Sequence, residues 1–284
     1  MATVRSSFFS LPRTDDCSIR VQEGRWTDWP LPASCADSNS GYGTCGATAV
    51  RRWAYSPQAI RCGARRYDHT AIQGLLLGKR VAFVGDSVTR LLCGALLRAS
   101  GSQGQVVKLK HQDFEYQLEG DIVASFLWRP FPRNVTEQYK EWEIAKTAPD
   151  VVISSVSLWH MLHTTNASAF GSEMAALKGA AQAYSGMVGS RSVLLLGSTT
   201  ETFTNRQPTA RKRKNMTPGQ VDAYNEALAK QGLLQPEGPF RLLDMFALTQ
   251  GCGEECSLDG IHSVDAVYDT ALQLMLNIYR LSEG

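Results

Sequence analysis

Three residues in two short segments of the chain could together perform acyl transfer. Ser87 ends the sequence Gly85-Asp86-Ser87, and Asp259 and His262 lie three positions apart near the other end of the chain. A serine hydroxyl is a weak nucleophile until an adjacent imidazole removes its proton, and a carboxylate then holds that imidazole in the required tautomer. These residue types predict Ser87 as the nucleophile, His262 as the general base and Asp259 as the orienting carboxylate.

The residues around Ser87 predict a strand, a sharp turn and a helix. An apolar run at 80–84 precedes the Gly-Asp turn, and a helical pattern follows over 88–99. This arrangement places the hydroxyl at the N-terminus of a helix, where the backbone amides of Ser87 and Val88 can stabilise an oxyanion. We expect Asp86 to accept a hydrogen bond from the turn backbone.

Two other side chains near these segments could contact a substrate. Arg90 lies one helical turn after Ser87. Its guanidinium could orient the site or contact an anionic substrate, or it could form a structural ion pair. Trp159 follows the end of a predicted strand at 150–156 and could form a wall on which a sugar stacks, or it could belong to the core. The sequence leaves both alternatives open for each residue.

Strand and helix signals alternate from residue 79 to the end of the chain. Continuous apolar runs, as at 150–153 and 192–196, are typical of strands covered on both faces. This alternation predicts an α/β fold with a doubly wound parallel sheet, whose ligands bind beyond the carboxyl ends of the strands. Residues 1–78 lack such periodicity and are expected to form an irregular, cysteine-rich N-terminal cap on a catalytic domain at 79–284. The expected strands are 80–84, 105–110, 121–127, 150–156, 193–198 and 240–244. The expected helices are 88–99, 136–147, 168–187, 217–231 and 264–280.

The charge and the hydropathy of the chain argue against two broad classes. With a formal net charge of +2 over 284 residues, the chain is too near neutral to predict nucleic-acid binding. The one dense basic run, 211–214, is interpreted as a solvated loop rather than an anion or targeting patch. No apolar stretch reaches the roughly 20 residues of a membrane-spanning helix, and 1–12 lacks the apolar centre of a signal peptide. We expect no membrane segment in this chain, although a fuller form could be membrane-associated.

The cysteines and the glycosylation sequons point to the secretory pathway. The chain has seven cysteines, and four of them lie in the first 62 residues, where little apolar sequence is available for a core. We expect these four to form disulfides together with Cys252 and Cys256, with the pairing left open, and Cys93 to be the odd, buried thiol. Three Asn-x-Ser/Thr sequons, expected in loops, support a lumenal glycoprotein. The four N-terminal cysteines are Cys17, Cys35, Cys45 and Cys62, and the sequons begin at Asn134, Asn166 and Asn215.

Three sequence blocks resemble the SGNH/GDSL hydrolase superfamily, and within it the PC-esterase group. The block 78–90 resembles the nucleophile segment of that group, and 257–262 resembles its Asp-His segment. The block 216–227 resembles a helix of the sialate O-acetyltransferase family, while Trp26 and Trp53 are similar to residues of trichome-birefringence-like polysaccharide O-acetyltransferases. The resemblance implies a flavodoxin-like three-layer α/β/α sandwich and transfer of acetyl groups to sugar hydroxyls. It also implies acetyl-CoA as the acetyl donor, no bound cofactor and a location in the Golgi lumen.

One position departs from the pattern of the superfamily. SGNH enzymes usually supply a glycine and an asparagine after later strands as oxyanion-hole donors, and Ser155 stands where that asparagine would be. A serine hydroxyl can also donate, and loss of one oxyanion donor typically costs about 10²–10³ in rate. The candidate residues around the substrate and the oxyanion are Gly85, Asp86, Val88, Arg90, Ser155 and Trp159.

The sequence leaves more than one function open. The leading hypothesis is an O-acetyltransferase that acts on a glycan or a sialic-acid-like sugar. A carbohydrate O-acetylesterase would use the same three residues with water as acceptor, and Ser155 also motivates a non-catalytic glycan-binding domain on the same fold. A zinc site formed by His160, His163, Cys252 and Cys256 is a weaker alternative, because the two cysteines can instead form a disulfide. We therefore expect no metal.

Overall fold

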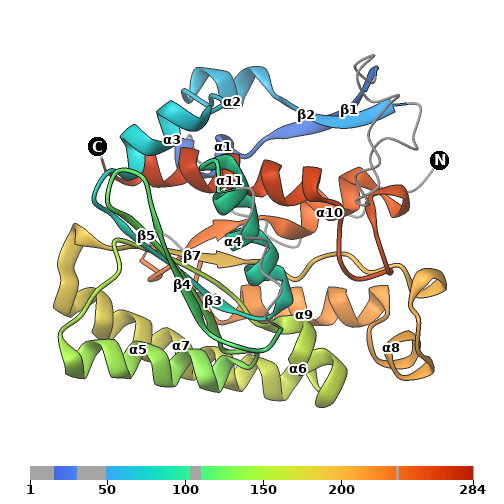
Figure 1. Ribbon diagram of the computed structural model, residues 1–284. Coiled ribbons are helices and arrows are strands. Elements are labelled where there is room, and N and C mark those ends of the chain that lie inside the picture. Colours follow the sequence, from blue (N-terminus) through green and yellow to red (C-terminus); the bar gives the residue numbers. More distant parts are fainter. Residues whose placement is uncertain (1–15, 31–48, 103–109, 235–236, 284) are drawn as a thin grey trace.

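A six-stranded sheet between two layers of helices forms the centre of the molecule (Figure 1). The computed structural model describes residues 16–30, 49–102, 110–234 and 237–283. The strand order is β4-β5-β3-β6-β7-β8, and the five strands from β5 to β8 in this order run parallel. The strands are β3 (Arg80–Gly85), β4 (Phe114–Leu118), β5 (Ile122–Trp128), β6 (Val151–Ser155), β7 (Val193–Gly197) and β8 (Arg241–Leu243).

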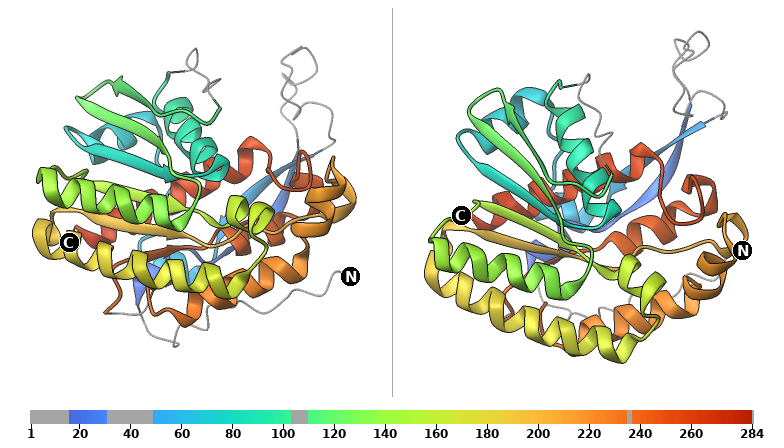
Figure 2. Two further views of the ribbon diagram at one scale, coloured as in Figure 1. Left: turned by 90° about the horizontal axis from the view of Figure 1, so that it is seen from below. Right: turned by 60° about the horizontal axis from the view of Figure 1, so that its bottom comes forward.

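Helices cover both faces of this sheet. Helices α5, α7 and α9 pack side by side on one face, and α4 packs against α11 on the other (Figure 2). Strands β6 and β7 are buried along their whole length, as their apolar runs predict. The three-layer α/β/α class is thereby confirmed. The long helices are α4 (Ser87–Ala99), α5 (Pro132–Ala145), α7 (Ala167–Val188), α9 (Pro218–Lys230) and α11 (Asp265–Ser282). Shorter helices are α6 (Ser157–His163), α8 (Ala210–Asn215) and α10 (Met245–Cys252).

The edge strand β4 is the main departure from the expected sheet. It runs antiparallel to β5, with Phe114 opposite Phe126. The strand expected at 105–110 lies almost wholly outside the described residues. β4 itself was not predicted, although its residues alternate between apolar and polar side chains, which is the pattern of a half-buried strand. Gly120 and Asp121 take φ values of 79° and 54° in the tight connection to β5.

The boundaries of the helices follow from their capping residues. Helix α9 begins as predicted, because Thr217 Oγ1 accepts a hydrogen bond from the Gln220 amide and Pro218 is the first helical residue. Helix α5 begins at Pro132, one turn earlier than predicted, again with proline in the first turn. It ends where Lys146 adopts the left-handed conformation, with φ of 53°.

Two expectations about loops are wrong, one of them in part. The basic run 211–214 is not a loop but lies in the short helix α8, whose first turn is capped by Thr209. Of the three sequons expected in loops, Asn166 lies in one, just before α7, whereas Asn134 lies in α5 and Asn215 is the last residue of α8. Asparagine and threonine are favoured at helix ends as well as in turns, so composition alone does not separate the two cases.

The described part of the N-terminal region packs on helices α10 and α11. Its elements are the antiparallel hairpin β1 (Gly24–Pro30) and β2 (Ala49–Tyr55) with helices α1 (Cys17–Arg20), α2 (Pro57–Arg61) and α3 (His69–Leu76). A disulfide joins Cys17 to Cys62. The buried Asn277 of α11 accepts a hydrogen bond from the Arg65 amide (3.1 Å) and donates one to the Arg65 carbonyl (2.8 Å). Cys35 and Cys45 lie outside the described residues.

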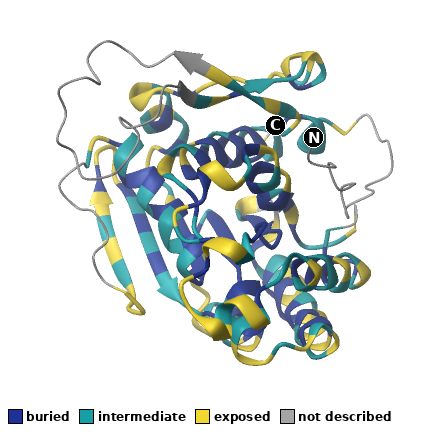
Figure 3. Ribbon diagram, turned by 90° about the vertical axis from the view of Figure 1, so that its right-hand side faces the viewer, coloured by how far each residue is buried: buried dark blue, intermediate teal, exposed yellow. Residues whose placement is uncertain are grey.

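Buried residues concentrate between the sheet and its helical layers (Figure 3). Cys93 of α4 is free and buried, as expected, and burial raises the pKa of its thiol. A second disulfide joins Cys252 to Cys256, and two disulfides fit an oxidising compartment such as the secretory pathway. Among the residues that the structure describes, none of the helices is both long and apolar enough to span a bilayer.

Candidate active site

Ser87 begins helix α4 two positions after the last residue of β3. Gly85 has φ of 154°, and a Cβ at this position would collide with the carbonyl oxygen of Ser155 and with the hydroxyl of Thr89. That carbonyl accepts hydrogen bonds from the Asp86 amide (3.2 Å) and from Thr89 Oγ1 (3.2 Å). The glycine and the neighbouring strand β6 therefore fix the turn that presents the Ser87 hydroxyl.

Asp86 is fully buried within this turn and caps α4. Its Oδ1 accepts a hydrogen bond from the Val88 amide (3.0 Å), which is the contact with the turn backbone expected from the sequence. Burial raises the pKa of the Asp86 carboxyl to about 6, although the amide of Val88, the imidazole of His262 and the amides of Leu158 and Trp159 all favour its ionised form. The buried carboxyl of Asp86, whose ionised form is disfavoured by burial, is thus adjacent in the chain to the candidate nucleophile Ser87.

The loop between α10 and α11 brings Asp259 and His262 beside Ser87. Nε2 of His262 lies 2.8 Å from Oγ of Ser87, and Nδ1 of the same ring lies 3.0 Å from Oδ2 of Asp259. The other carboxylate oxygen of Asp259 accepts hydrogen bonds from the amides of Ile261 (3.1 Å) and His262 (2.8 Å). The tautomer with its proton on Nδ1, facing the carboxylate, leaves Nε2 free to accept a proton from the serine.

The pKa of Asp259 is shifted in the opposite direction from that of Asp86. Its partial burial favours the protonated carboxyl, but the hydrogen bond and charge of His262, together with the two backbone amides, outweigh burial and lower the pKa well below its usual range. Asp259 is therefore an ionised acceptor for the imidazole at neutral pH. The two carboxyl groups near Ser87 have pKa values displaced in opposite directions.

A glycine shapes the loop between Asp259 and His262. Gly260 has φ of 79°, and a Cβ there would collide with the carbonyl oxygen of Phe203. Its carbonyl accepts a hydrogen bond from the Phe203 amide (2.8 Å), and its amide donates one to Ser257 Oγ (2.9 Å). The loop is thus held against the segment that follows β7.

The candidate oxyanion donors differ in the hydrogen bonds they already make. The Val88 amide donates to Asp86, so it is not free to bind an oxyanion, which corrects the expectation for this residue. The Ser87 amide is the first of helix α4 and has no acceptor within the helix. Ser155 contributes its carbonyl to the Gly85 turn, and its side chain lies buried beside Gly197 of β7.

Arg90 lies half-buried at the interface of α4 and α11. Burial lowers the pKa of its guanidinium, while Tyr268 of α11 and Asp86 act in the opposite direction. Arg90 therefore supplies a positive charge near the buried carboxyl of Asp86.

A cluster of aromatic rings, called here the aromatic wall, begins beside the nucleophile turn. It consists of Trp128, Trp159, His111 and His163. Trp159 meets Trp128 edge to face with 5.2 Å between ring centroids, stacks on His163 at 4.7 Å, and meets His111 at 5.1 Å. Trp128 is paired with Gly85 in the sheet, which ties the wall to the nucleophile turn.

Sequence reasoning singled out Trp159 but missed the other members of the wall. Trp128 directly follows the strand predicted at 121–127, so the rule that ligands bind beyond strand ends could have found it. His111 directly follows the strand predicted at 105–110, so the same rule could have pointed to it. Nη2 of Arg211, in the basic run, lies 3.1 Å from Nδ1 of His163, and this contact links α8 to the aromatic wall.

The zinc alternative is wrong. Cys252 and Cys256 are joined in a disulfide, which removes both thiolates as ligands. His160 is buried and its Nδ1 lies 2.8 Å from the hydroxyl of Tyr224, whereas His163 belongs to the aromatic wall. In the described parts of the chain, no three histidine, cysteine or acidic side chains gather as a metal site would require.

Comparison with known proteins identifies the family. No protein-family model matches the chain. Protein ALTERED XYLOGLUCAN 9 of Arabidopsis thaliana is 30% identical over 284 residues, which cover 92% of this chain and 77% of that protein. The chain belongs to the SGNH/PC-esterase group. This confirms the resemblance that its sequence blocks indicated, and the chain is an acyltransferase or a related esterase of this group.

Two further similarities involve a shorter or more distant match. The N-acetylneuraminate (7)9-O-acetyltransferase of Danio rerio is 26% identical over 225 residues, which cover 78% of this chain and 28% of that protein. Among solved structures, the acetyl xylan esterase AlAXEase has a TM-score of 0.45 and 16% identity, and the match covers 69% of this chain and 97% of the esterase.

Proposed function

We propose that this chain is an O-acetyltransferase that carries an acetyl group on Ser87 and passes it to a hydroxyl of a glycan or a sialic-acid-like sugar. One observation carries the proposal. Ser87 Oγ lies 2.8 Å from His262 Nε2, and Asp259 Oδ2 lies 3.0 Å from the other nitrogen of the same ring. This is the order of groups by which an imidazole activates a serine hydroxyl.

In the first half-reaction, Ser87 Oγ attacks the carbonyl carbon of the acetyl donor while Nε2 of His262 takes the hydroxyl proton. The negative charge that develops on the carbonyl oxygen falls near the N-terminus of α4, where the Ser87 amide can donate to it. When the tetrahedral intermediate collapses, the bond to the leaving group breaks and the imidazolium returns its proton to that group. Asp259, ionised and fixed by two backbone amides, stabilises the imidazolium.

In the second half-reaction, His262 removes a proton from a sugar hydroxyl, whose oxygen attacks the acetyl ester on Ser87. Collapse of this intermediate releases the acetylated sugar, and the proton on His262 returns to Ser87 Oγ. Water in place of the sugar would give acetate by the same steps, so a transferase must favour the sugar by binding it. The alternative of an O-acetylesterase therefore differs only in the acceptor.

The aromatic wall supports a carbohydrate acceptor. Indole and imidazole rings offer apolar faces, which suit the C–H faces of a sugar ring. Trp159 is half-exposed, and its own backbone amide faces the Asp86 carboxyl. The names of two relatives also refer to carbohydrates, xyloglucan in one and N-acetylneuraminate in the other. The family resemblance further suggests acetyl-CoA as the donor and the Golgi lumen as the location.

Two measurements on the purified chain test this proposal. A fluorophosphonate probe should label the wild type and leave Ser87→Ala unlabelled, which separates an enzyme from a non-catalytic glycan-binding domain. Product analysis with acetyl-CoA and candidate glycans should then show acetylated sugar. If wild type and Ser87→Ala behave alike towards the probe, the proposal fails. If only free acetate forms with every acceptor, the transferase gives way to the esterase.

A further inference from the structure

We propose that Arg51, on the N-terminal hairpin, is a positioning residue for His262. It acts through the loop at 252–262, called here the base loop, which carries Asp259 and His262. This inference rests on the proposed function, because it concerns the placement of the general base. It assigns to the hairpin β1–β2 a part in the chemistry that takes place on the catalytic domain.

The base loop has little regular structure of its own. Between α10 and α11 it contains one 3₁₀ turn (Glu254–Cys256) and one isolated bridge between Ser257 and Ser263. Its backbone hydrogen bonds are mostly local, such as that from the Leu258 amide to the His262 carbonyl (2.7 Å), while the bond from the Phe203 amide to the Gly260 carbonyl (2.8 Å) joins it to another segment. A shift of about 1 Å in a catalytic group can cost on the order of 10² in rate. The position of His262 therefore depends on contacts that reach the loop from elsewhere.

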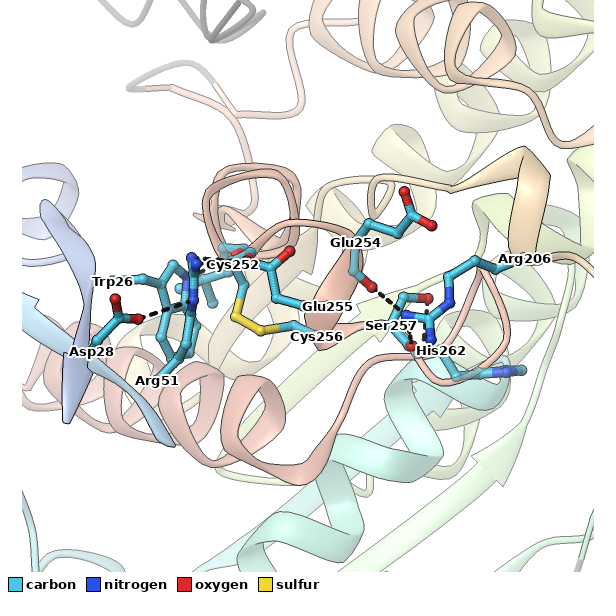
Figure 4. Close-up of a disulfide and its surroundings, with 11 residues drawn as sticks. Trp26, Asp28, Arg51, Arg206, Cys252, Glu254, Glu255, Cys256, Ser257 and His262 are labelled. Atoms are coloured by element: carbon cyan, nitrogen blue, oxygen red, sulfur yellow. Dashed lines mark hydrogen bonds and ion pairs between the residues drawn. A yellow bond between two sulfur atoms is a disulfide. The ribbon is translucent and has the colours of Figure 1, made fainter. Parts of the chain in front are cut away.

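Arg51 makes two such contacts (Figure 4). Its Nη1 donates to the carbonyl of Cys252 (3.0 Å), and its Nη2 pairs with Glu255 Oε1 (2.5 Å). Its Nε lies 3.5 Å from Oδ1 of Asp28, the residue opposite it in the hairpin. A planar guanidinium can hold several partners in fixed directions at once, which a lysine ammonium does not do. Arg51 thus fixes the first turn of the base loop to the hairpin.

The hairpin is itself seated on the helix that leads into the base loop. Trp26 Nε1 donates to the carbonyl of Leu248 (2.9 Å) in α10. A Cβ at Gly251 would lie 3.4 Å from the Trp26 ring, and Trp26 meets the buried Trp53 of β2 edge to face at 5.5 Å. The hairpin that carries Arg51 is therefore held on α10 by the packing of Trp26 as well as by the ion pairs of Arg51.

The Cys252–Cys256 disulfide connects the part of the loop that Arg51 holds to the part nearer His262. It links Cys252, whose carbonyl Arg51 binds, to Cys256, whose carbonyl accepts a hydrogen bond from Val264 (2.8 Å) beyond the histidine. From the opposite side, Arg206 Nη1 donates to the carbonyl oxygens of Glu254 (2.5 Å) and Ser257 (2.7 Å). Two arginines from distant parts of the chain therefore hold the loop on either side (Figure 4).

The contacts of Arg51 predict an effect on catalysis rather than on stability. The Arg51 and Glu255 side chains are 34% and 56% exposed, and ion pairs of this kind contribute little to the free energy of unfolding. Arg51→Gln should therefore lower kcat for acetyl transfer about tenfold or more, change KM less than twofold and leave Tm nearly unchanged. Arg51→Lys should recover part of kcat, because lysine can still pair with Glu255. Arg25→Gln is the matched control, since Arg25 is an exposed arginine on the neighbouring strand of the same hairpin.

A second readout follows the histidine directly. In proton NMR, the low-field signal of the His262 Nδ1–H bonded to Asp259 should be present in the wild type and in Arg25→Gln, and broadened or lost in Arg51→Gln. Wild-type kcat and an unchanged signal in Arg51→Gln would overturn the inference, as would an equal loss in Arg25→Gln. If Arg51→Gln does not fold, Glu255→Gln decides by the same measurements. A wild type without transfer or probe labelling would instead contradict the proposed function.

Discussion

The two halves of the candidate active site are held in place by different means. The nucleophile side consists of the end of β3, the Gly85 turn and α4, and nearly all of it is buried against β6. The base side is a loop whose Asp259 and His262 side chains are 34% and 25% exposed, and its anchors come from residues far away in the sequence. The fold itself therefore determines the position of Ser87, whereas individual side-chain contacts determine the position of His262.

The largest effects are expected from the residues that complete the hydrogen-bonded chain. His262→Ala and Asp259→Asn should each lower kcat by on the order of 10³ or more while the protein remains folded, because the first removes the base and the second removes the carboxylate that sets its tautomer. Steady-state kinetics with circular dichroism as a folding control would measure this. Near-normal turnover in either variant would show that these residues do not act on Ser87.

Two glycine substitutions compare the two sides directly. Gly85→Ala puts a methyl group against the Ser155 carbonyl inside the sheet, so it should lower the free energy of unfolding by about 3 kcal/mol or more and abolish activity. Gly260→Ala meets the Phe203 carbonyl within a loop rather than within the sheet, so it should lower kcat tenfold or more with a smaller loss of stability. Denaturant unfolding and kinetics on both variants would test this. A larger loss of stability in Gly260→Ala would reverse the comparison.

The two carboxyl groups should give opposite pH dependences of stability. The pKa of Asp86 is raised from 3.8 to about 6, so its contribution to stability is present below pH 3.8 and is lost as pH rises through 6. This shift of the pKa corresponds to a change of about 3 kcal/mol in the free energy of unfolding. The free energy of unfolding of the wild type relative to Asp86→Asn should therefore fall over this range, since asparagine still caps the helix.

Asp259→Asn is the matched comparison for that experiment. The pKa of Asp259 is lowered, so its contribution is present above pH 3.8 and is lost as pH falls. Relative to this variant, the wild type should gain stability as pH rises towards neutrality. If the stability difference between wild type and variant changed with pH in the same direction for both aspartates, the opposite pKa shifts assigned to them would be contradicted.

The smallest effect is expected in the aromatic wall, which lies on the nucleophile side and, in the proposed reaction, would contact the acceptor. Trp159→Ala should raise KM for a glycan acceptor several-fold, as expected from loss of about 0.5–1.5 kcal/mol of aromatic contact, and Trp159→Phe should recover part of it. The rate of labelling by a small fluorophosphonate should stay near that of the wild type. A selective fall in labelling, with KM unchanged, would place Trp159 in the chemistry instead.

The same division explains what could be predicted from the sequence. The strand, turn and helix around Ser87 follow from a local apolar run, a glycine and a capping aspartate, and they were predicted within a residue or two. The helix α8 was missed because its basic run has no apolar periodicity, whereas the edge strand β4 was missed although its side chains alternate between apolar and polar. The contacts of Arg51 and Arg206 with the base loop join residues that are far apart in the chain, so no local pattern could reveal them. Val88 was misjudged because the sequence cannot show that the amide is already bonded to Asp86.

In the proposed reaction, Ser87 carries the acetyl group between donor and acceptor. The most direct test mixes the chain with acetyl-CoA in the absence of any sugar, quenches in acid and maps the peptides by mass spectrometry. We expect the mass of one acetyl group on the Ser87 side chain in the wild type, its loss when a glycan acceptor is added before the quench, and no such species in Ser87→Ala. Acetylated sugar formed by a wild type that never carries acetyl on Ser87 would contradict the proposed reaction.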